Sequence, residues 1–490
     1  MSVKNELLYK TAKELRTALD NREISAKEIL DSTYSRLEEV EDKVQSYNSL
    51  TKELAYETAK EVDEKIKNGE KISPLAGIPI AVKDNINVKG YKTTASSKML
   101  ENFVSPYDAT VSKKIKENLI PVVGKVNLDE FAMGSSTENS AFKKTCNPWN
   151  LNHVPGGSSG GSASSVAAGQ ATISLGSDTG GSIRLPASFC GVVGMKPTYG
   201  SVSRFGLIAF ASSLDQIGPL GLCVEDVAMT LEAISGYDAN DSTSLEVAVP
   251  KYTETLKNGI KDLRIGVISE LLGEGVDPEV KASVEAAIKV YESLGAKIEE
   301  ISLPHNKYAI ATYYILATAE ASANLARYDG VKYGYRTPDA ENIMEMYTKT
   351  RAEGFGDEVK RRIMLGTYAL SSGYYDAYYK KAQQVRALMK QDFDKAWQHV
   401  DILISPTCPS TAFEFGSKVA DPLSMYLMDI ATITANLAGI PGMSLPCGFD
   451  SKGLPIGLQI LGPALSEETM LRAAYAFEQA VNINTKRPNL

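Results

Sequence analysis

The sequence predicts an α/β protein whose centre lies in a nearly uncharged stretch. Short apolar runs at residues 120–126 and 172–175 alternate with segments of helical periodicity, a pattern typical of helices layered on a sheet. Residues 151–214 contain only the charged side chains Asp178, Arg184, Lys196 and Arg204. Because charged side chains are rarely buried, this stretch is expected to form the centre of the fold.

The first 70 residues predict helices. Ser25-Ala26-Lys27-Glu28 fits a capping box, and apolar residues follow it at helical spacing. Residues 75–82 form a short apolar run interrupted by Gly77 and Pro79, which indicates a buried strand entered through a turn. Residues 162–170 are rich in small side chains and predict a closely packed helix.

The remainder of the chain predicts further layers of the same kind. The expected elements are a surface connection at 236–262, a strand–helix–strand unit at 263–267, 278–291 and 297–301, helices over 308–400, a strand at 400–405, strands joined by tight turns, and a helix at 467–481. No short repeat is present. We therefore expect a single domain over 1–490, divided into an N-terminal helical segment (1–70), a core (71–235) and a remainder that completes the sheet and adds a helical substrate or partner region (236–490).

Composition excludes several classes of function. The net charge of −8 does not suggest a long basic surface for nucleic acid, so any nucleic acid would be held mainly by a partner. Residues 1–6 do not resemble a signal peptide and no run of 18 apolar residues occurs, which favours a cytoplasmic protein. The five scattered cysteines lack a CxxC spacing and predict neither a disulfide framework nor a metal site.

The candidate chemistry consists of a lysine and two serine clusters. Lys83 follows the apolar run 78–82, while residues 156–162 and 178–184 each combine glycines with serine. A lysine can act as a base when burial lowers its pKa from the usual value of about 10.4. The alternative for Lys83 is an exposed lysine at a strand end, paired with Asp84.

Two other interpretations of these clusters remain open. Gly156-x-Ser158-x-Gly160 matches a nucleophile-elbow pattern, and His153 lies close enough in sequence to serve a Ser-His-Asp triad. A flexible surface loop or a phosphate cradle is the alternative for the glycines. Without side chains in the way, the amides of Thr179, Gly180, Gly181 and Ser182 could instead form an oxyanion hole.

Three long motifs identify a family resemblance. Residues 156–163, 176–187 and 191–198 resemble the amidase signature. Residues 127–138, 204–216 and 359–368 resemble one branch of that family, the glutamine-hydrolysing subunits of tRNA-dependent amidotransferases. The resemblance extends over nearly the whole chain. It implies a large mixed central sheet covered by helices on both faces.

The resemblance also implies a Ser–cis-Ser–Lys triad. Ser182 would be the nucleophile, Ser158 the bridging serine in a cis peptide with Gly157, and Lys83 the base. The amides of residues 179–182 would receive the oxyanion. Asp429 would bind the α-ammonium of glutamine and Arg362 its α-carboxylate. The alternatives are a surface ion pair for Arg362 and a helix-surface carboxylate for Asp429.

Partners are implied by the resemblance as well. Ammonia would pass to a B subunit that binds ATP, Mg²⁺ and the misacylated tRNA and converts Glu-tRNA(Gln) or Asp-tRNA(Asn), with no cofactor on this chain. A small C subunit would complete a heterotrimer. The competing hypotheses are a stand-alone amidase for small or apolar amides and a non-catalytic interaction subunit. Helix packing or a protein interface is expected, rather than base stacking, for the tyrosines Tyr368, Tyr374, Tyr375, Tyr378 and Tyr379.

Overall fold

A computed structural model describes residues 7–418, 421–483 and 486–490. Its strands form an eleven-stranded sheet in the order β1-β3-β2-β4-β6-β5-β10-β11-β9-β7-β8. The strands are β1 (Tyr47–Leu50), β2 (Ile80–Lys83), β3 (Val122–Val126), β4 (Ile173–Asp178), β5 (Val193–Lys196), β6 (Gln216–Gly221), β7 (Arg264–Ile268), β8 (Lys297–Ile301), β9 (Ile402–Pro406), β10 (Gly442–Phe449) and β11 (Pro455–Leu461).

The sheet is mixed, as the family resemblance implied. Strand β2 runs parallel to β3 on one side and to β4 on the other. Strand β4 is antiparallel to β6, and β5 and β10 continue the antiparallel part. The strands β9, β7 and β8 are parallel again at the far edge. The end of β2, which carries Lys83, is thereby enclosed by strands on both sides.

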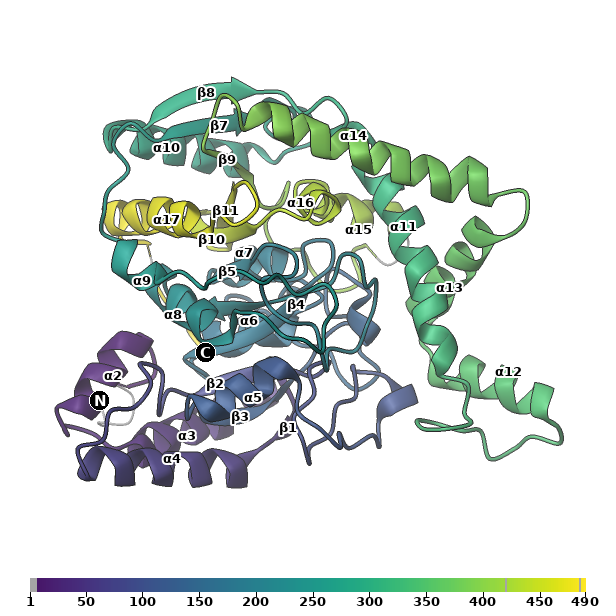
Figure 1. The fold of residues 1–490 in the computed structure, drawn as a ribbon, viewed down its shortest axis with the longest axis horizontal. Coiled ribbons are helices and arrows are strands. Elements are labelled where there is room, and N and C mark those ends of the chain that lie inside the picture. Colours follow the sequence, from purple (N-terminus) through teal and green to yellow (C-terminus); the bar gives the residue numbers. More distant parts are fainter. Residues whose placement is uncertain (1–6, 419–420, 484–485) are drawn as a thin grey trace.

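Helices cover both faces of the sheet (Figure 1). One face packs against α5 (Thr110–Glu117), α8 (Val224–Ile234), α10 (Pro278–Ser293) and α17 (Glu467–Val481), and the other against α6 (Gly160–Ala167), α7 (Arg184–Cys190), α14 (Lys381–Ala396) and α16 (Ile433–Ala438). Strand β9 shows the alternation that this requires: Ile402 and Ile404 join the apolar cluster of the first face, while Leu403 joins that of the second.

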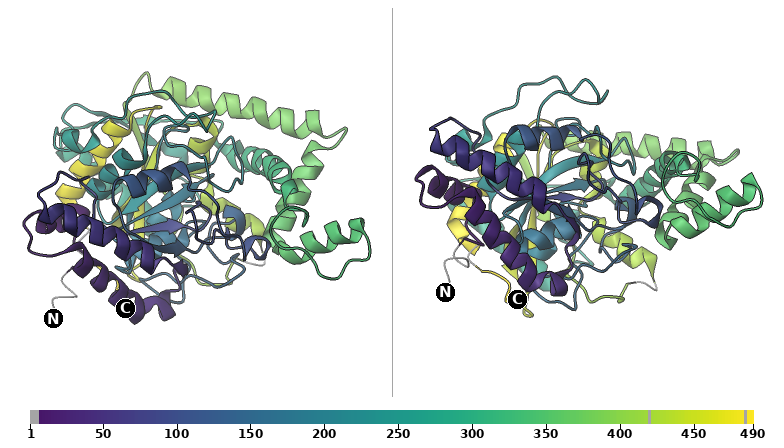
Figure 2. Two further views of the ribbon diagram at one scale, coloured as in Figure 1. Left: turned by 60° about the horizontal axis from the view of Figure 1, so that its bottom comes forward. Right: turned by 90° about the horizontal axis from the view of Figure 1, so that it is seen from below.

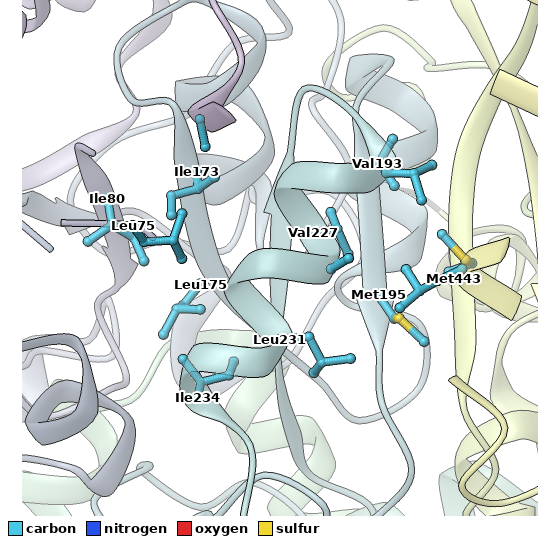
Figure 3. Close-up of a cluster of buried hydrophobic side chains, with 14 of the residues drawn as sticks. Leu75, Ile80, Ile173, Leu175, Val193, Met195, Val227, Leu231, Ile234 and Met443 are labelled. Carbon is cyan, nitrogen blue, oxygen red and sulfur yellow. The ribbon is translucent and has the colours of Figure 1, made fainter. Parts of the chain in front are cut away.

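The apolar cluster on the first face is the larger part of the core. In Figure 3, Val227 and Leu231 of α8 lie beside strands β4 and β5, which contribute Leu175 and Met195. These side chains are fully buried. Burial of a side chain of this size contributes roughly 1.5–3 kcal/mol, so α8 is anchored to the sheet mainly by this contact.

In the described part of the N-terminal segment, residues 7–70, one strand accompanies the predicted helices. The helices are α2 (Ala12–Asp20), α3 (Ala26–Val44) and α4 (Lys52–Lys67), and the capping box at Ser25 is confirmed. The strand is β1, in a segment predicted to be helical; it forms the sheet edge and pairs antiparallel with β3. A four-residue edge strand is too short for a period-2 pattern to stand out in the sequence.

Residues 309–396 form a mainly helical segment, of which the part around residues 343–370 projects from the body (Figures 1 and 2). It consists of α11 (Ala309–Asn324), α12 (Ile343–Gly354), α13 (Asp357–Leu370), a π-helical turn at Tyr375–Lys380 and α14, so the helical prediction for 308–400 is confirmed. Two of its tyrosines, Tyr368 and Tyr374, pack with ring centroids 4.3 Å apart and remain half-exposed.

The remaining predictions largely agree with the structure. The strand–helix–strand unit is β7–α10–β8, and α17 begins and ends at the predicted residues. The helix predicted at 162–170 is α6, which begins two residues earlier, at Gly160. The surface connection contains the short helix α9 (Tyr252–Thr255). None of the helices described is both long and apolar enough to cross a membrane.

Candidate active site

Lys83 is the last residue of β2 and is completely buried. Its Nζ lies 2.8 Å from Ser158 Oγ, 2.7 Å from Ser159 Oγ and 2.9 Å from Ser177 Oγ. The enclosing strands β3 and β4 explain the burial, because a residue at the end of a central strand is shielded by both neighbours. The lysine head group is therefore surrounded by serine hydroxyls.

Burial also changes the acidity of this lysine. Removal from water disfavours the ammonium form and lowers the pKa of Lys83 to about 7, against a partial opposing effect of Asp129, Asp178 and Asp215. A substantial neutral fraction is thus available near neutral pH. The alternative of an exposed lysine paired with Asp84 is wrong, because Asp84 pairs instead with the buried Lys125 at 3.0 Å.

The Gly157–Ser158 peptide bond is cis, as the resemblance implied. A β-carbon on Gly157 would lie 2.1 Å from Asp129 Oδ2, so only glycine fits there. The next residue links the two serine clusters: the Ser159 amide donates to the carbonyl of Ser182 at 3.1 Å. The structure therefore brings Lys83, Ser158 and Ser182 together from three separate segments.

Ser182 lies in the loop between β4 and α7, which Asp178 organises. The Asp178 carboxylate accepts hydrogen bonds from the amides of Gly181 (2.8 Å) and Ile183 (3.1 Å) and pairs with the buried Arg184. Burial alone would raise the pKa of Asp178, but the charge and hydrogen bonds of Arg184 outweigh it and hold the pKa at about 2. The loop is thus fixed around an ionised carboxylate.

This arrangement changes the predicted oxyanion hole in one respect. The amide of Gly181 is already used by Asp178. The amides of Thr179, Gly180 and Ser182 are the predicted donors that remain for an oxyanion. Ser182 is 8% exposed, whereas Ser158 is fully covered. A substrate would therefore reach Ser182 rather than Ser158.

Asp429 ends the 3₁₀ helix η7 (Leu427–Asp429) and is buried, so the alternative of a helix-surface carboxylate is wrong. Its Oδ2 accepts a hydrogen bond from Ser135 Oγ at 2.7 Å. Burial raises the pKa of Asp429 to about 7, although Ser135 and the Arg362 charge act in the opposite direction. A cationic ligand group would stabilise the ionised form.

Arg362 of α13 is also buried, with 3% of its side chain exposed. Its Nε donates to Glu358 Oε1 at 2.8 Å, so it forms an ion pair, but not the surface pair considered as its alternative. The guanidinium carbon lies 5.1–5.7 Å from the ring centres of three aromatic residues: Phe210, Tyr314 and Tyr426. Within the described residues its Nη groups have no hydrogen-bond partner, which leaves a planar fork for a carboxylate.

The histidine alternative is not supported by the geometry. The backbone of His153 bonds to Asn147 and Asn150, and its Nδ1 has no hydrogen-bond partner in the described part of the chain. Lys83 occupies the position beside Ser158 that a triad histidine would need. The nucleophile-elbow pattern around Ser158 therefore does not mark the nucleophile of a Ser-His-Asp triad.

Several residues of the site were not predicted. Ser177 and Ser159 contact Lys83, Ser135 contacts Asp429, and Glu358 holds Arg362. The three serines lie within the motifs 127–138, 156–163 and 176–187. The family resemblance therefore pointed to their segments, but nothing in the sequence assigned these serines a role. Tyr314 and Tyr426 come from distant helices, and no sequence pattern placed them at Arg362.

Known proteins resemble this chain along nearly its whole length. A family model described as Amidase matches residues 28–471. The A subunit of the glutamyl-tRNA(Gln) amidotransferase of Carboxydothermus hydrogenoformans is 58% identical over 99% of this chain and 100% of the relative. The crystal structure of the Thermotoga maritima protein of the same name is 42% identical, with a TM-score of 0.77 over 97% of this chain and 94% of that one.

A structure named as a hydrolase has a higher TM-score than that subunit. The 6-aminohexanoate cyclic dimer hydrolase has a TM-score of 0.86 over 98% of this chain and 99% of its own, at 25% identity. The fold is therefore shared between a protein named as an amidotransferase subunit and one named as a hydrolase. The residues that bind the substrate have to decide between such activities.

Proposed function

The chain belongs to the amidase signature family, and we propose that it is the glutamine-hydrolysing component, the A subunit, of a glutamyl-tRNA(Gln) amidotransferase. Within this function, glutamine is converted to glutamate and ammonia. One observation carries the proposed chemistry: the buried Nζ of Lys83 lies 2.8 Å from Ser158 Oγ, beside the loop of Ser182. A neutral amine at this position can accept a proton from a serine.

The proposed reaction has two halves. Ser182 Oγ attacks the side-chain amide carbon of glutamine while its proton moves to Ser158 and the proton of Ser158 moves to Lys83 Nζ. The amides of Thr179, Gly180 and Ser182 stabilise the oxyanion. The proton then returns through Ser158 to the departing nitrogen, which leaves as ammonia. Water cleaves the γ-glutamyl ester by the same route and releases glutamate.

Selection of glutamine is proposed to rest on Asp429 and Arg362. An amino acid presents one ammonium and one carboxylate, and each of these buried side chains supplies the opposite charge. The Arg362 charge lowers the pKa of Asp429, so the two side chains act on each other electrostatically. A stand-alone amidase for apolar amides has no use for such a pair, which disfavours that alternative.

The assembly is also part of the proposal. We propose that ammonia passes to a B subunit that carries ATP and Mg²⁺ and binds the misacylated tRNA, that a C subunit completes the heterotrimer, and that this chain itself needs no cofactor. The name of the relatives, which are subunits, supports this view. A cytoplasmic location is proposed with it.

The test is ammonia release from glutamine by this chain copurified with its partner subunits, compared with Ser182→Ala. Loss of activity in the variant supports a serine glutaminase. Ser182-dependent hydrolysis of apolar amides, with none of glutamine, would favour the stand-alone amidase. No reaction with either amide, and no labelling of Ser182 by a serine-directed amide electrophile, would favour a non-catalytic subunit.

A further inference from the structure

Thr432 lies between the two parts of the proposed site. It follows η7, which carries Asp429, and it precedes α16. The residue is fully buried. Threonine at such a position usually caps the helix with its hydroxyl, but Thr432 makes no cap hydrogen bond. Its hydroxyl is available for another contact.

That contact is with the Ser182 loop. Thr432 Oγ1 lies 2.6 Å from the carbonyl oxygen of Gly180 and 3.0 Å from the carbonyl oxygen of Asp429. A hydroxyl has one hydrogen to donate, so the two carbonyls share it or compete for it. Through this single group, the backbone of Asp429 and the backbone of the loop are in contact.

The Gly180–Gly181 peptide is held from both sides. Its carbonyl accepts from Thr432, and its amide, the N–H of Gly181, donates to Asp178 Oδ1 at 2.8 Å. A peptide group is planar, so these two bonds define its orientation. The flanking peptide groups, which carry the amides of Gly180 and Ser182, are joined to it through the α-carbons of Gly180 and Gly181, so its orientation limits where these amides and the Ser182 hydroxyl can lie.

The close approach of Thr432 depends on glycine. A β-carbon on Gly181, whose φ is +136°, would lie 2.2 Å from Thr432 Oγ1. The carbonyl of Thr432 is fixed as well, because it accepts from Nη1 of Arg184 at 3.0 Å. Thr432 is thus packed against the loop with little freedom to move away from it.

We propose that Thr432 is a positioning residue that couples binding of the substrate ammonium at Asp429 to the geometry of the loop that carries Ser182. This inference rests on the proposed function. An ammonium that binds Asp429 pulls on its carboxylate and on the segment between Asp429 and Thr432. The Thr432 hydroxyl passes this displacement on to the Gly180–Gly181 peptide. Recognition of the α-ammonium then raises the rate of the chemical step in addition to improving binding.

The test compares glutamine with glutaramate, the same amide without the α-ammonium, in the copurified complex. Wild type is expected to have a higher kcat for glutamine than for glutaramate. Thr432→Val keeps the shape but removes the hydroxyl, and it should lower this kcat ratio about 5-fold or more while the KM ratio is retained. A purely structural defect would lower both kcat values equally.

Three variants serve as controls. Thr432→Ser keeps a hydroxyl and should retain the wild-type kcat ratio. Thr434→Val, two residues further along in α16 and also buried, should retain it too, since no bond joins Thr434 to the loop among the described residues. If Thr432→Val does not fold, as judged by its thermal unfolding midpoint, Thr432→Ala removes the same hydroxyl.

Two results would overturn the inference alone: a wild-type kcat ratio near one, or a ratio that Thr432→Val leaves unchanged, in each case with glutamine hydrolysed normally. A wild-type complex that does not hydrolyse glutamine is a different result. It would overturn the proposed function, and this inference with it.

Discussion

Lys83 Nζ and Ser158 Oγ lie 2.8 Å apart although 75 positions separate them in the chain. The contact forms because β2 ends at Lys83 between the neighbouring strands β3 and β4, with α6 beginning just beyond Ser158. The sheet thus excludes water from a lysine and places a serine beside it. These two effects are the physical basis of the proposed chemistry.

The first prediction concerns pH. Since burial lowers the pKa of Lys83 to about 7 and the base must be neutral, kcat/KM for glutamine should rise with pH through about 7 and level off above it. The measurement is a pH–rate profile from about pH 5.5 to 9, with ammonia as the product. A rise centred near 10 would show an unperturbed lysine instead.

Lys196 provides a matched control for this profile. It is also fully buried, and burial, assisted by the Arg184 charge, lowers its pKa to about 7. Its Nζ contacts the carbonyls of Pro197 and Ile440 rather than a serine. Lys83→Met should abolish activity. Lys196→Met should leave the midpoint of the pH–rate profile unchanged, measured on the protein that remains folded.

The second prediction concerns the bridging serine. Ser158→Ala interrupts proton transfer between Ser182 and Lys83, and kcat should fall by about 10²–10⁴. Ser165→Ala is the control: this buried hydroxyl bonds within α6 to the carbonyl of Ser162, so its loss should change kcat less than about twofold. Equal kcat values for the two variants would exclude Ser158 from the relay.

The agreement between sequence and structure is best where the signals are local. The capping box at Ser25 and the periodicity of 467–481 locate two helix termini, because both patterns involve contacts within one or two turns. The burial of Lys83 was also indicated locally, by the apolar residues before it. The catalytic roles of Ser158 and Ser182 were predicted from the resemblance of their motifs to the amidase signature, and no physical argument from the sequence alone assigned them.

The rest of the site depends on contacts between distant segments. Arg362 is surrounded by Phe210, Tyr314 and Tyr426, which belong to a loop and two other helices. Nothing in the spacing of these residues along the chain relates them to one another. The use of the Gly181 amide by Asp178 was missed for a related reason, since hydrogen bonding within a loop depends on its backbone dihedral angles.

The third prediction concerns the substrate carboxylate. Arg362→Lys retains the charge but loses the planar fork, so KM for glutamine should rise about tenfold or more while kcat changes less. Arg361→Lys is the control, because Arg361 is the adjacent residue but 46% of its side chain is exposed. Steady-state kinetics of ammonia release measures both. An equal KM for the two variants would remove Arg362 from substrate binding.

The fourth prediction concerns stability. Arg184→Met leaves Asp178 buried without its partner, and the free energy of unfolding in urea should fall by about 3–5 kcal/mol. Arg264→Met breaks the more exposed pair with Asp401 and should cost less than about 1 kcal/mol. Similar losses in the two variants would contradict the role assigned to burial.

The same pair predicts a dependence on pH. The pKa of Asp178 is lowered to about 2 in the folded protein, so its contribution to stability is present above the unfolded value of about 3.9 and disappears as pH falls toward 2. The difference in unfolding free energy between wild type and Arg184→Met should therefore shrink below about pH 4. A constant difference down to about pH 2 would contradict this assignment.

The most direct test of the central claim is to locate the acyl group. The copurified complex is quenched with acid during turnover of glutamine and digested, and its peptides are measured by mass spectrometry. We expect a γ-glutamyl ester on Ser182 in the wild type and none in Ser182→Ala. A γ-glutamyl group on a different residue, or undiminished ammonia release by Ser182→Ala, would contradict the account.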